Sequence, residues 1–146
     1  RVLFRSDVVT ALQRRVPHIP VILAPASVQG ANAPLELLQS LQNLVAWHSP
    51  LSASDISNLA IDVILMVRGG GAMEDLWAFN DEALVRAVAS CPIPIISGVG
   101  HETDFTLLDF VADLRAPTPT AAAEMVAVER SQRLLELDLI EIVPCF

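Results

Sequence analysis

The stretch "IDVILMVRGGG", residues 61–71, runs from an almost wholly apolar segment into an arginine and three glycines. Its apolar part lacks the alternation of a half-exposed strand, which is typical of a strand buried in a parallel sheet. A second stretch, "IPIISGVGHETD" at 93–104, has the same order of an apolar run, glycines and polar side chains. Ligands bind at the carboxyl ends of strands in open parallel sheets, so both polar turns are expected to face one crevice.

Helical and extended patterns alternate around these two strands. The predicted elements are helices over 8–16, 35–45, 73–91, 105–114 and from 121 onward, and strands over 21–25, 61–67 and 93–97. The apolar positions of the second helix are 35, 38, 41 and 45, and the third is expected to break near Asn80 with Asp81 as a new N-cap. Thr118 or Thr120 is the expected cap of the last helix. The order indicates an α/β fold with a Rossmann-like layered architecture, in which helices flank a mainly parallel sheet whose three strands are neighbours.

Composition restricts the classes of protein to which the chain can belong. The 146 residues suit one domain, and 53% of them are hydrophobic, but no apolar run approaches the roughly 20 residues of a membrane span. Only two cysteines are present and no signal peptide is recognisable, so a cytoplasmic protein is expected. The net charge of −8 argues against a nucleic-acid-binding surface on this segment taken alone.

Both ends of the sequence are excluded from the predicted domain. "RVLFRS" at 1–6 resembles the translation of a sequencing adapter, so the native chain is expected to begin near Asp7. Residues 136–146 are expected to be a truncated tail of uncertain status, which leaves one domain over 7–135.

The turn formed by Arg68, Gly69, Gly70 and Gly71 is a candidate phosphate-binding site. Glycines let the backbone approach a ligand and present its N–H groups to an anion. The arginine adds a forked donor that matches phosphate oxygens. The alternative is a tight strand-to-helix turn with Arg68 in a structural ion pair.

The polar run from His101 to Asp104 is a candidate centre for proton transfer. Histidine titrates near neutral pH, and an aspartate three residues later can orient it or hold a cation. The alternative makes Thr103 or Asp104 a helix cap. We expect His101 and Arg68 to lie outside the core, with Arg68, His101 and Asp104 converging within about 10 Å, one phosphate's reach with hydrogen bonds at each end.

Other polar and aromatic residues carry weaker signals. His18 and His48 are interpreted as surface residues beside prolines. Trp77 and Phe79 are interpreted as core or lip residues rather than platforms for base stacking. The acidic run at 74–75 and 81–82 suits a helix start, where the dipole favours negative charge. No Cys/His spacing suggests zinc.

Two segments together resemble a known enzyme family. "IDVILMVRGGGAMEDLWAFNDEALVRAV" and "IPIISGVGHETDFTLLDFVADLRAPTPTAAAE" closely resemble the catalytic domain of the large subunit of bacterial exodeoxyribonuclease VII, and the resemblance covers about residues 7–133. It implies an enzyme that cuts single-stranded DNA from either end, leaves 5′-phosphates and works with a small subunit. It also implies that DNA-binding regions outside this segment supply most of the cationic contacts.

The resemblance assigns roles to individual residues. The family's catalytic arginine, histidine and aspartate fall on Arg68, His101 and Asp104, and an upstream acidic residue falls on Asp7. Two departures are visible: Ala72 stands where the family usually has serine, and the 44–60 connection is longer than usual. A metal requirement does not follow from the sequence, and Mg²⁺ is one candidate cation.

Two other functions are compatible with parts of the pattern. A nucleotide or cofactor kinase could use a glycine-rich strand end, but no GxxxxGK[ST] loop occurs. A non-catalytic scaffold that positions partner subunits would tolerate replacement of His101 and Asp104. Nuclease assays on single-stranded DNA separate the three hypotheses.

Overall fold

The computed structural model describes residues 3–48, 61–69, 73–100 and 103–127. Within them the chain forms a three-stranded sheet of order β1-β2-β3 in which both pairings are parallel. β1 spans Ile64–Val67, β2 spans Ile95–Gly98 and β3 spans Leu114–Arg115. The predicted α/β class is therefore confirmed, as is the parallel pairing of the strands predicted at 61–67 and 93–97.

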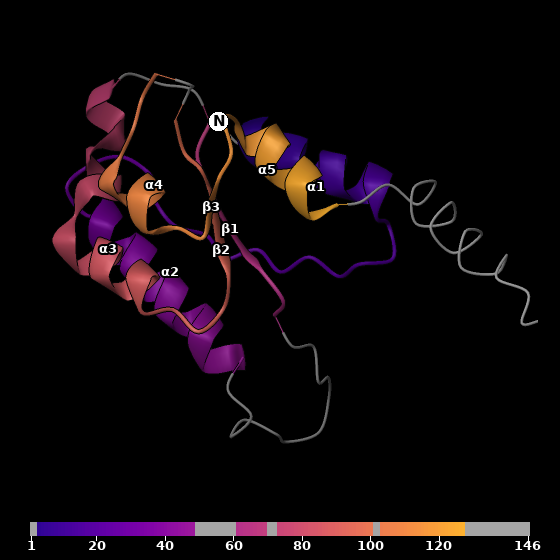
Figure 1. The fold of residues 1–146 in the computed structure, drawn as a ribbon, viewed down its shortest axis with the longest axis horizontal. Helices are drawn as coiled ribbons and strands as arrows, with labels where there is room; N and C mark the ends of the chain where they lie inside the picture. Colours follow the sequence, from indigo (N-terminus) through magenta and orange to yellow (C-terminus); the bar gives the residue numbers. More distant parts are fainter. Residues whose placement is uncertain (1–2, 49–60, 70–72, 101–102, 128–146) are drawn as a thin grey trace, which may run out of the picture.

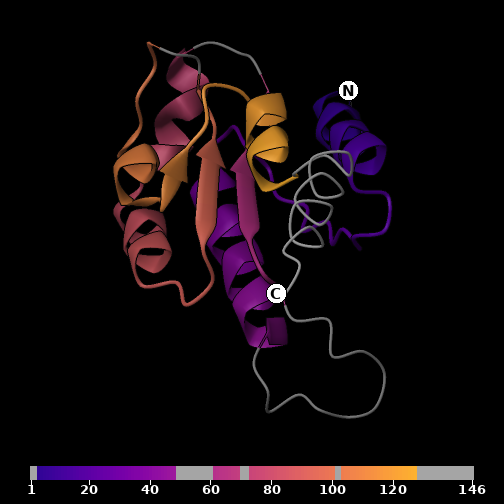
Figure 2. The ribbon, with the colours of Figure 1, turned by 45° about the vertical axis from the view of Figure 1, so that its right-hand side comes forward.

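Helices cover both faces of the sheet. They are α1 (Leu3–Arg15), α2 (Ala33–His48), the 3-10 helix η2 (Met73–Asn80), α3 (Glu82–Ala89), α4 (Leu107–Val111) and α5 (Pro119–Val126). Figure 1 shows α2, α3 and α4 on one side of the strands and α5 and α1 on the other. The three strand arrows are seen side by side in Figure 2, with α5 beside them.

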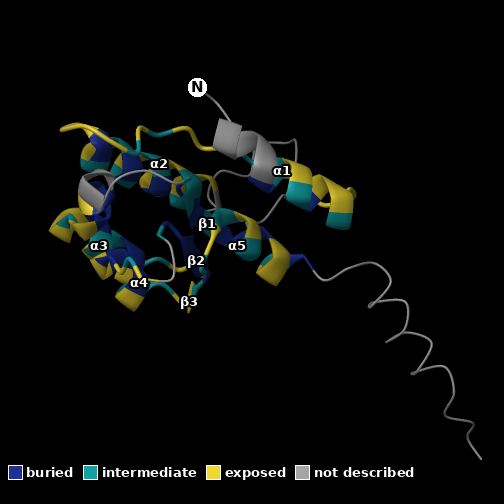
Figure 3. Cartoon of the chain, turned by 90° about the horizontal axis from the view of Figure 1, so that it is seen from above, coloured by how far each residue is buried: buried dark blue, intermediate teal, exposed yellow. Residues whose placement is uncertain are grey.

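Alternating side chains of the strands produce two cores. Ile64 and Ile95 belong to the core with α2 and α3, whereas Ile96 packs with Ala122 of α5. Successive residues of a strand point to opposite faces, so strands buried on both faces need apolar residues at consecutive positions. A third cluster joins Val8 and other α1 residues to α5. Figure 3 shows the buried residues around the strands and exposed residues on the outer sides of the helices.

The predicted caps of two helices are confirmed. The Asp81 carboxylate accepts a hydrogen bond of 3.0 Å from the Leu84 N–H, which separates η2 from α3 close to the break expected near Asn80. The Thr118 hydroxyl oxygen accepts a bond of 3.0 Å from the Ala121 N–H at the start of α5. Both caps satisfy N–H groups that have no partner inside the helix.

The buried stripe of α2 differs in part from the prediction. Ala33, Leu37 and Leu41 are buried, whereas Leu35 is 57% exposed. The helix begins two residues before Leu35, and positions four apart form one stripe along it. Leu41 belongs to the predicted stripe and to the observed one.

The strand predicted over 21–25 was wrong. The described chain from 18 to 29 forms no strand, and Val21 and Leu23 are exposed. Pro20 and Pro25 bracket the segment, and neither has an N–H group to donate to a neighbouring strand. Its apolar composition therefore did not lead to pairing with β1.

The helix predicted over 105–114 was too long. α4 ends at Val111, and the chain then pairs with β2 as β3. The Asp113 carboxylate accepts a hydrogen bond of 2.8 Å from the Ile95 N–H, and the Asp113 N–H donates to the Ile95 carbonyl at 3.0 Å. These bonds to β2 replace the helical bonds that a longer α4 would make. None of the helices in the described ranges has the length and apolarity needed to cross a membrane.

Candidate functional site

The carboxyl ends of β1 and β2 lie next to each other. Val67 is paired in register with Gly98, and the Arg68 N–H donates a hydrogen bond of 3.3 Å to the Gly98 carbonyl. The turn that begins at Arg68 and the turn that follows Gly98 therefore start side by side at one edge of the sheet. Gly69 is described, whereas Gly70, Gly71 and His101 lie outside the described residues.

Arg68 is buried, with 6% of its surface exposed, although we expected it to lie outside the core. That expectation was wrong because the residue directly continues β1 and is held against the end of β2 by its backbone N–H. A buried guanidinium is tolerated only where polar or charged groups satisfy it, and Arg68 is among the residues that have such interactions. Because Arg68 is buried, substitutions at this position will affect the stability of the fold as well as the binding of any ligand.

Gly100 and Asp104 approach each other very closely. A Cβ atom built on Gly100 would collide with the backbone carbonyl oxygen of Asp104, so only glycine fits at this position. The Thr103 hydroxyl donates a hydrogen bond of 3.3 Å to the partly exposed Asp104 carboxylate. The backbone thus holds Asp104 close to the end of β2.

The cap of α4 is Thr106, not Thr103 or Asp104. The Asp109 carboxylate accepts hydrogen bonds from the Thr106 N–H at 2.8 Å and from the Thr106 hydroxyl at 2.9 Å. The interpretation of Asp104 as a structural helix cap was therefore wrong. Its carboxylate is not used to begin α4.

A buried polar network lies beneath this turn. Asp109 also accepts a hydrogen bond from the Ser97 hydroxyl, and the Arg115 Nε lies 3.8 Å from an Asp109 carboxylate oxygen. The network ties β2, the start of α4 and β3 together around the segment that contains His101 and Asp104. Our sequence reasoning missed it, although the spacing of Thr106 and Asp109 is that of a capping box and Ser97 interrupts an apolar strand.

The amino end of α5 reaches the same edge. A Cβ atom on Gly98 would lie 3.1 Å from the Thr118 carbonyl oxygen and 3.0 Å from the Ala122 Cβ. Glycine therefore allows α5 to pack closely against the end of β2. The amino end of a helix favours negative charge, so this placement adds positive potential at the edge where Arg68 lies.

Asp7 belongs to α1, at the position before the buried Val8. Its side chain lies outside the described residues. The helix itself makes contacts that fix its position. α1 packs on α5, and the Arg15 guanidinium lies 3.0 Å from the Glu124 carboxylate. The helix of Asp7 thus contacts the helix whose amino end lies at the sheet edge.

The two aromatic residues of η2 have different environments. Both were predicted to be core or lip residues. Phe79 is 1% exposed and belongs to the core, whereas the 73% exposure of Trp77 excludes it from the core. His18 is exposed, as predicted, and the His48 side chain lies outside the described residues. Among the described side chains, no group of three His, Cys, Asp or Glu residues could hold a metal ion.

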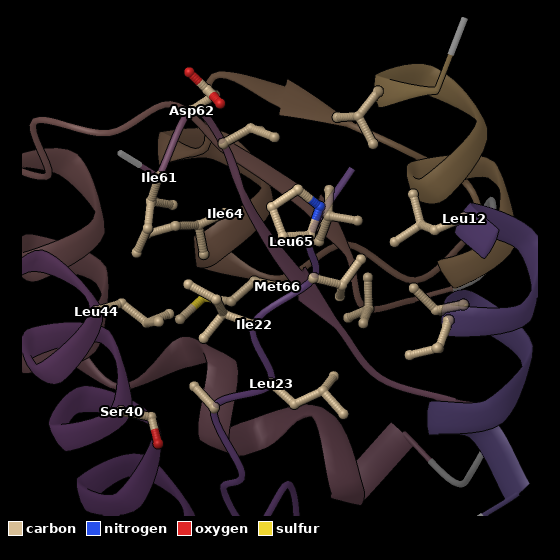
Figure 4. Close-up of a pocket in the computed structure, with 18 of the residues that line it drawn as sticks. Leu12, Ile22, Leu23, Ser40, Leu44, Ile61, Asp62, Ile64, Leu65 and Met66 are labelled. Carbon is tan, nitrogen blue, oxygen red and sulfur yellow. The ribbon is translucent and has the colours of Figure 1, made fainter. Parts of the chain in front are cut away.

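An apolar pocket of about 800 Å³ reaches Val67 at the end of β1. α1, the chain from 18 to 28, α2 and β1 line it, and Figure 4 shows Leu12, Ile22, Leu44 and Met66 around it. Neither Arg68 nor Asp104 lines the pocket. It lies where the chain over 21–25 does not pair with β1, so we attribute it to that unpaired segment rather than to the chemistry at the strand ends.

Comparisons with known proteins identify relatives along most of the chain. The family model described as "Exonuclease VII, large subunit" matches residues 5–141. A protein of Delftia acidovorans named exodeoxyribonuclease 7 large subunit is 57% identical over 139 residues, covering 92% of this chain and 31% of the relative. Proteins of the same name from Neisseria meningitidis and Alcanivorax borkumensis are 53% and 55% identical, each covering 90% of this chain and 27% and 28% of the relative. The chain thus spans less than a third of the length of these relatives.

Proposed function

Because the chain belongs to the exonuclease VII large-subunit family, we propose that it forms the catalytic domain of an exodeoxyribonuclease that hydrolyses single-stranded DNA. The enzyme would cut phosphodiester bonds from either end and leave 5′-phosphates. The observation that supports this proposal best is the pairing of Val67 with Gly98 and of the Arg68 N–H with the Gly98 carbonyl. It brings side by side the two strand ends that lead into the candidate phosphate-binding turn and the candidate proton-transfer segment.

Arg68 and the backbone N–H groups of Gly69, Gly70 and Gly71 would hold the scissile phosphate and stabilise its growing negative charge. A phosphate that contacts Arg68 would meet a guanidinium that is largely shielded from water. Two unit charges 4 Å apart interact by about 1 kcal/mol in water but by about 4 kcal/mol at the effective dielectric constant found near a protein surface. The amino end of α5 would add to the same potential.

His101 would transfer a proton to or from the reacting groups, and Asp104 would orient it. The position of Asp104 supports this role, because its backbone carbonyl oxygen lies so close to Gly100 after β2 that a Cβ atom there would collide with it. Asp7 would assist from α1 as a second orienting group or a cation ligand. Mg²⁺ is held in proteins by one or two carboxylates together with substrate phosphates, so Asp104 and Asp7 are the groups that would hold it here.

The partners would be single-stranded DNA and the small subunit of exodeoxyribonuclease VII. We place the enzyme in the cytoplasm, where the thiol of Cys91 would stay reduced. A kinase-like phosphate-binding enzyme and a non-catalytic scaffold remain the alternatives, and no observation on the described residues favours either.

The test uses a complete large subunit that carries this segment, assembled with its small subunit. Cleavage of single-stranded oligonucleotides labelled at the 5′ or the 3′ end would be measured with and without a chelator, and the product ends would be identified by mass spectrometry. His101→Ala should lower the rate about 10²- to 10⁴-fold, because it removes a proton-transfer group. Arg68→Lys should also impair cleavage, because it keeps the charge but loses the planar fork.

Two controls match these substitutions. His18→Ala removes an exposed histidine and should leave the rate unchanged. Arg86→Lys alters an exposed arginine that pairs with Glu82 in α3 and should change neither the rate nor the melting temperature. Since Arg68 is buried, the cleavage rate of Arg68→Lys is measured well below the melting temperature of that variant. Full activity in His101→Ala would support the scaffold alternative and contradict the proposal.

A further inference from the structure

An exposed aromatic surface begins where the candidate site ends. It consists of Trp77 in η2 and of Phe105, Leu107 and Phe110 at and after the start of α4, all of them exposed. Phe110 is 74% exposed, about as much as Trp77. Single exposed apolar side chains are common, but four on two elements that contact each other form a candidate binding surface. We call these four residues the aromatic surface.

The two elements that carry the aromatic surface are in contact. The Asn80 side-chain oxygen accepts a hydrogen bond of 2.7 Å from the Leu107 N–H, and this bond joins the end of η2 to the start of α4. Trp77 precedes Asn80 by one turn of the 3-10 helix. Residues three apart in such a helix lie on the same side, about 6 Å apart along the axis. Trp77 therefore lies on the same side of η2 as Asn80, and Figure 3 shows exposed residues on the outer side of α4.

Two rings of the aromatic surface, those of Phe105 and Phe110, lie beside each other. The rings of Phe105 and Phe110 have centroids 6.0 Å apart with an interplanar angle of 30°. The Arg115 guanidinium carbon lies 4.0 Å from the Phe105 ring centroid. Aromatic faces with a neighbouring guanidinium are the groups on which the bases of single-stranded nucleic acids stack. Any base offers such a face, so this recognition does not depend on sequence.

The position of the surface favours a nucleic acid strand over a protein partner. Phe105 directly follows Asp104, and Trp77 lies in the first helix after the strand end that carries Arg68. Each of the two strand ends thus leads into an exposed aromatic residue. The net charge of −8 gives this segment little general attraction for phosphates, whereas stacking on rings is independent of that charge.

We propose that the aromatic surface binds the bases of single-stranded DNA beside the strand ends, with Trp77 as a principal stacking residue. The inference rests on the proposed function, because it names the place where the substrate of that function would be held. It assigns to Trp77 a role in binding the strand, not in proton transfer or phosphate contact.

The test compares ring-preserving and ring-removing variants in the complete large subunit with its small subunit. Trp77→Leu removes the ring but keeps an apolar side chain, and Trp77→Phe keeps a ring. Binding of a labelled thymidine oligonucleotide would be measured by anisotropy, and KM and kcat by cleavage. Loss of one stacked base should weaken binding and raise KM about 5- to 150-fold in Trp77→Leu, with little change in kcat. Trp77→Phe should recover most of the loss.

Two controls isolate stacking from other causes. Trp47→Leu removes the other tryptophan of the chain, which is also exposed but lies near the end of α2, and should leave binding unchanged. A strand of abasic sugar phosphates has nothing to stack, so Trp77→Leu and the parent should bind it equally.

Equal binding of the thymidine oligonucleotide by both proteins would overturn the inference. Loss of the small subunit from Trp77→Leu with unchanged DNA binding would assign the surface to a protein partner instead. A parent that binds DNA in the Trp77-dependent way but never cleaves it would refute the proposed nuclease function alone.

Discussion

Replacing Asp109 with asparagine should slow the proposed reaction without unfolding the protein. Asp109 accepts hydrogen bonds from the Ser97 hydroxyl and from the N–H and hydroxyl of Thr106. An asparagine can direct its carbonyl oxygen to the two Thr106 donors and its amide to Ser97, whose hydroxyl rotates to accept. The new side chain therefore keeps the geometry and loses the charge.

The magnitude follows from these bonds. A hydrogen bond to a charged group contributes about 1.5–3 kcal/mol and a neutral one about 0.5–1.5 kcal/mol, so neutralising the acceptor costs roughly 1 kcal/mol for each bond. The lower desolvation cost of a neutral amide offsets part of this sum. We expect Asp109→Asn to lower the free energy of unfolding by about 1–2 kcal/mol. Asp109→Ala would leave three buried donors without an acceptor and cost about 3–6 kcal/mol, a large share of the stability of a typical domain.

The activity should change more than the stability. The Asp109 network holds both ends of the segment that carries His101 and Asp104, and a displacement of about 1 Å in a catalytic group can cost about 10²-fold in rate. We expect kcat on single-stranded DNA to fall up to about 10²-fold in Asp109→Asn. KM reports separately on Arg115, which pairs with Asp109 and lies over the Phe105 ring of the aromatic surface. Thermal unfolding and steady-state cleavage by the assembled enzyme measure the two effects separately.

The matched control is Asp113→Asn. Asp113 accepts the Ile95 N–H at the other end of β2, at 2.8 Å, and is exposed. This variant should cost a similar or smaller amount of stability and leave kcat unchanged. The reasoning would be refuted by a parent-like kcat in Asp109→Asn, or by an equal loss of kcat in Asp113→Asn.

Two further variants test local features of the structure. Gly100→Ala should abolish most cleavage while DNA binding persists, because its Cβ would collide with the Asp104 carbonyl and displace the turn; parent-like kcat would contradict the close approach. Hydrogen bonds from the Ser27 side chain and N–H lower the pKa of Glu36, so its contribution to stability is present above the unfolded pKa and is lost as pH falls through the folded one. Ser27→Ala should raise the Glu36 pKa toward its ordinary value in an NMR titration, and an unchanged pKa would show that the side-chain bond is unimportant.

Features that depend on residues close together in the chain could be predicted from the amino-acid sequence. The apolar run before Arg68 and the run before Gly98 became the paired strands β1 and β2. Asp81 and Thr118 became N-caps, because a short polar side chain can satisfy the first N–H groups of a helix from its own position. These local rules, with the alternation of strands and helices, were sufficient to predict the α/β class.

Which apolar or polar segments pair with one another became visible only in the folded chain. The segment over 21–25 is as apolar as a strand but remains unpaired, whereas the short Leu114–Arg115 pairs with β2 because Asp113 bonds to Ile95. Pairing in a sheet depends on residues far apart in the chain, so periodicity within one segment could not predict it.

The candidate site likewise has features that were visible in the sequence and features that are visible only in the folded chain. Its glycines, Arg68 and the run from His101 to Asp104 were visible as a sequence pattern, and the pairing of Val67 with Gly98 places the ends of their strands side by side. The burial of Arg68 and the exposure of Trp77 were not visible in that pattern. Burial is a property of how separate elements pack together, so a residue's type determines what it can do chemically, whereas the folded chain determines whether water, a protein group or a ligand can reach it.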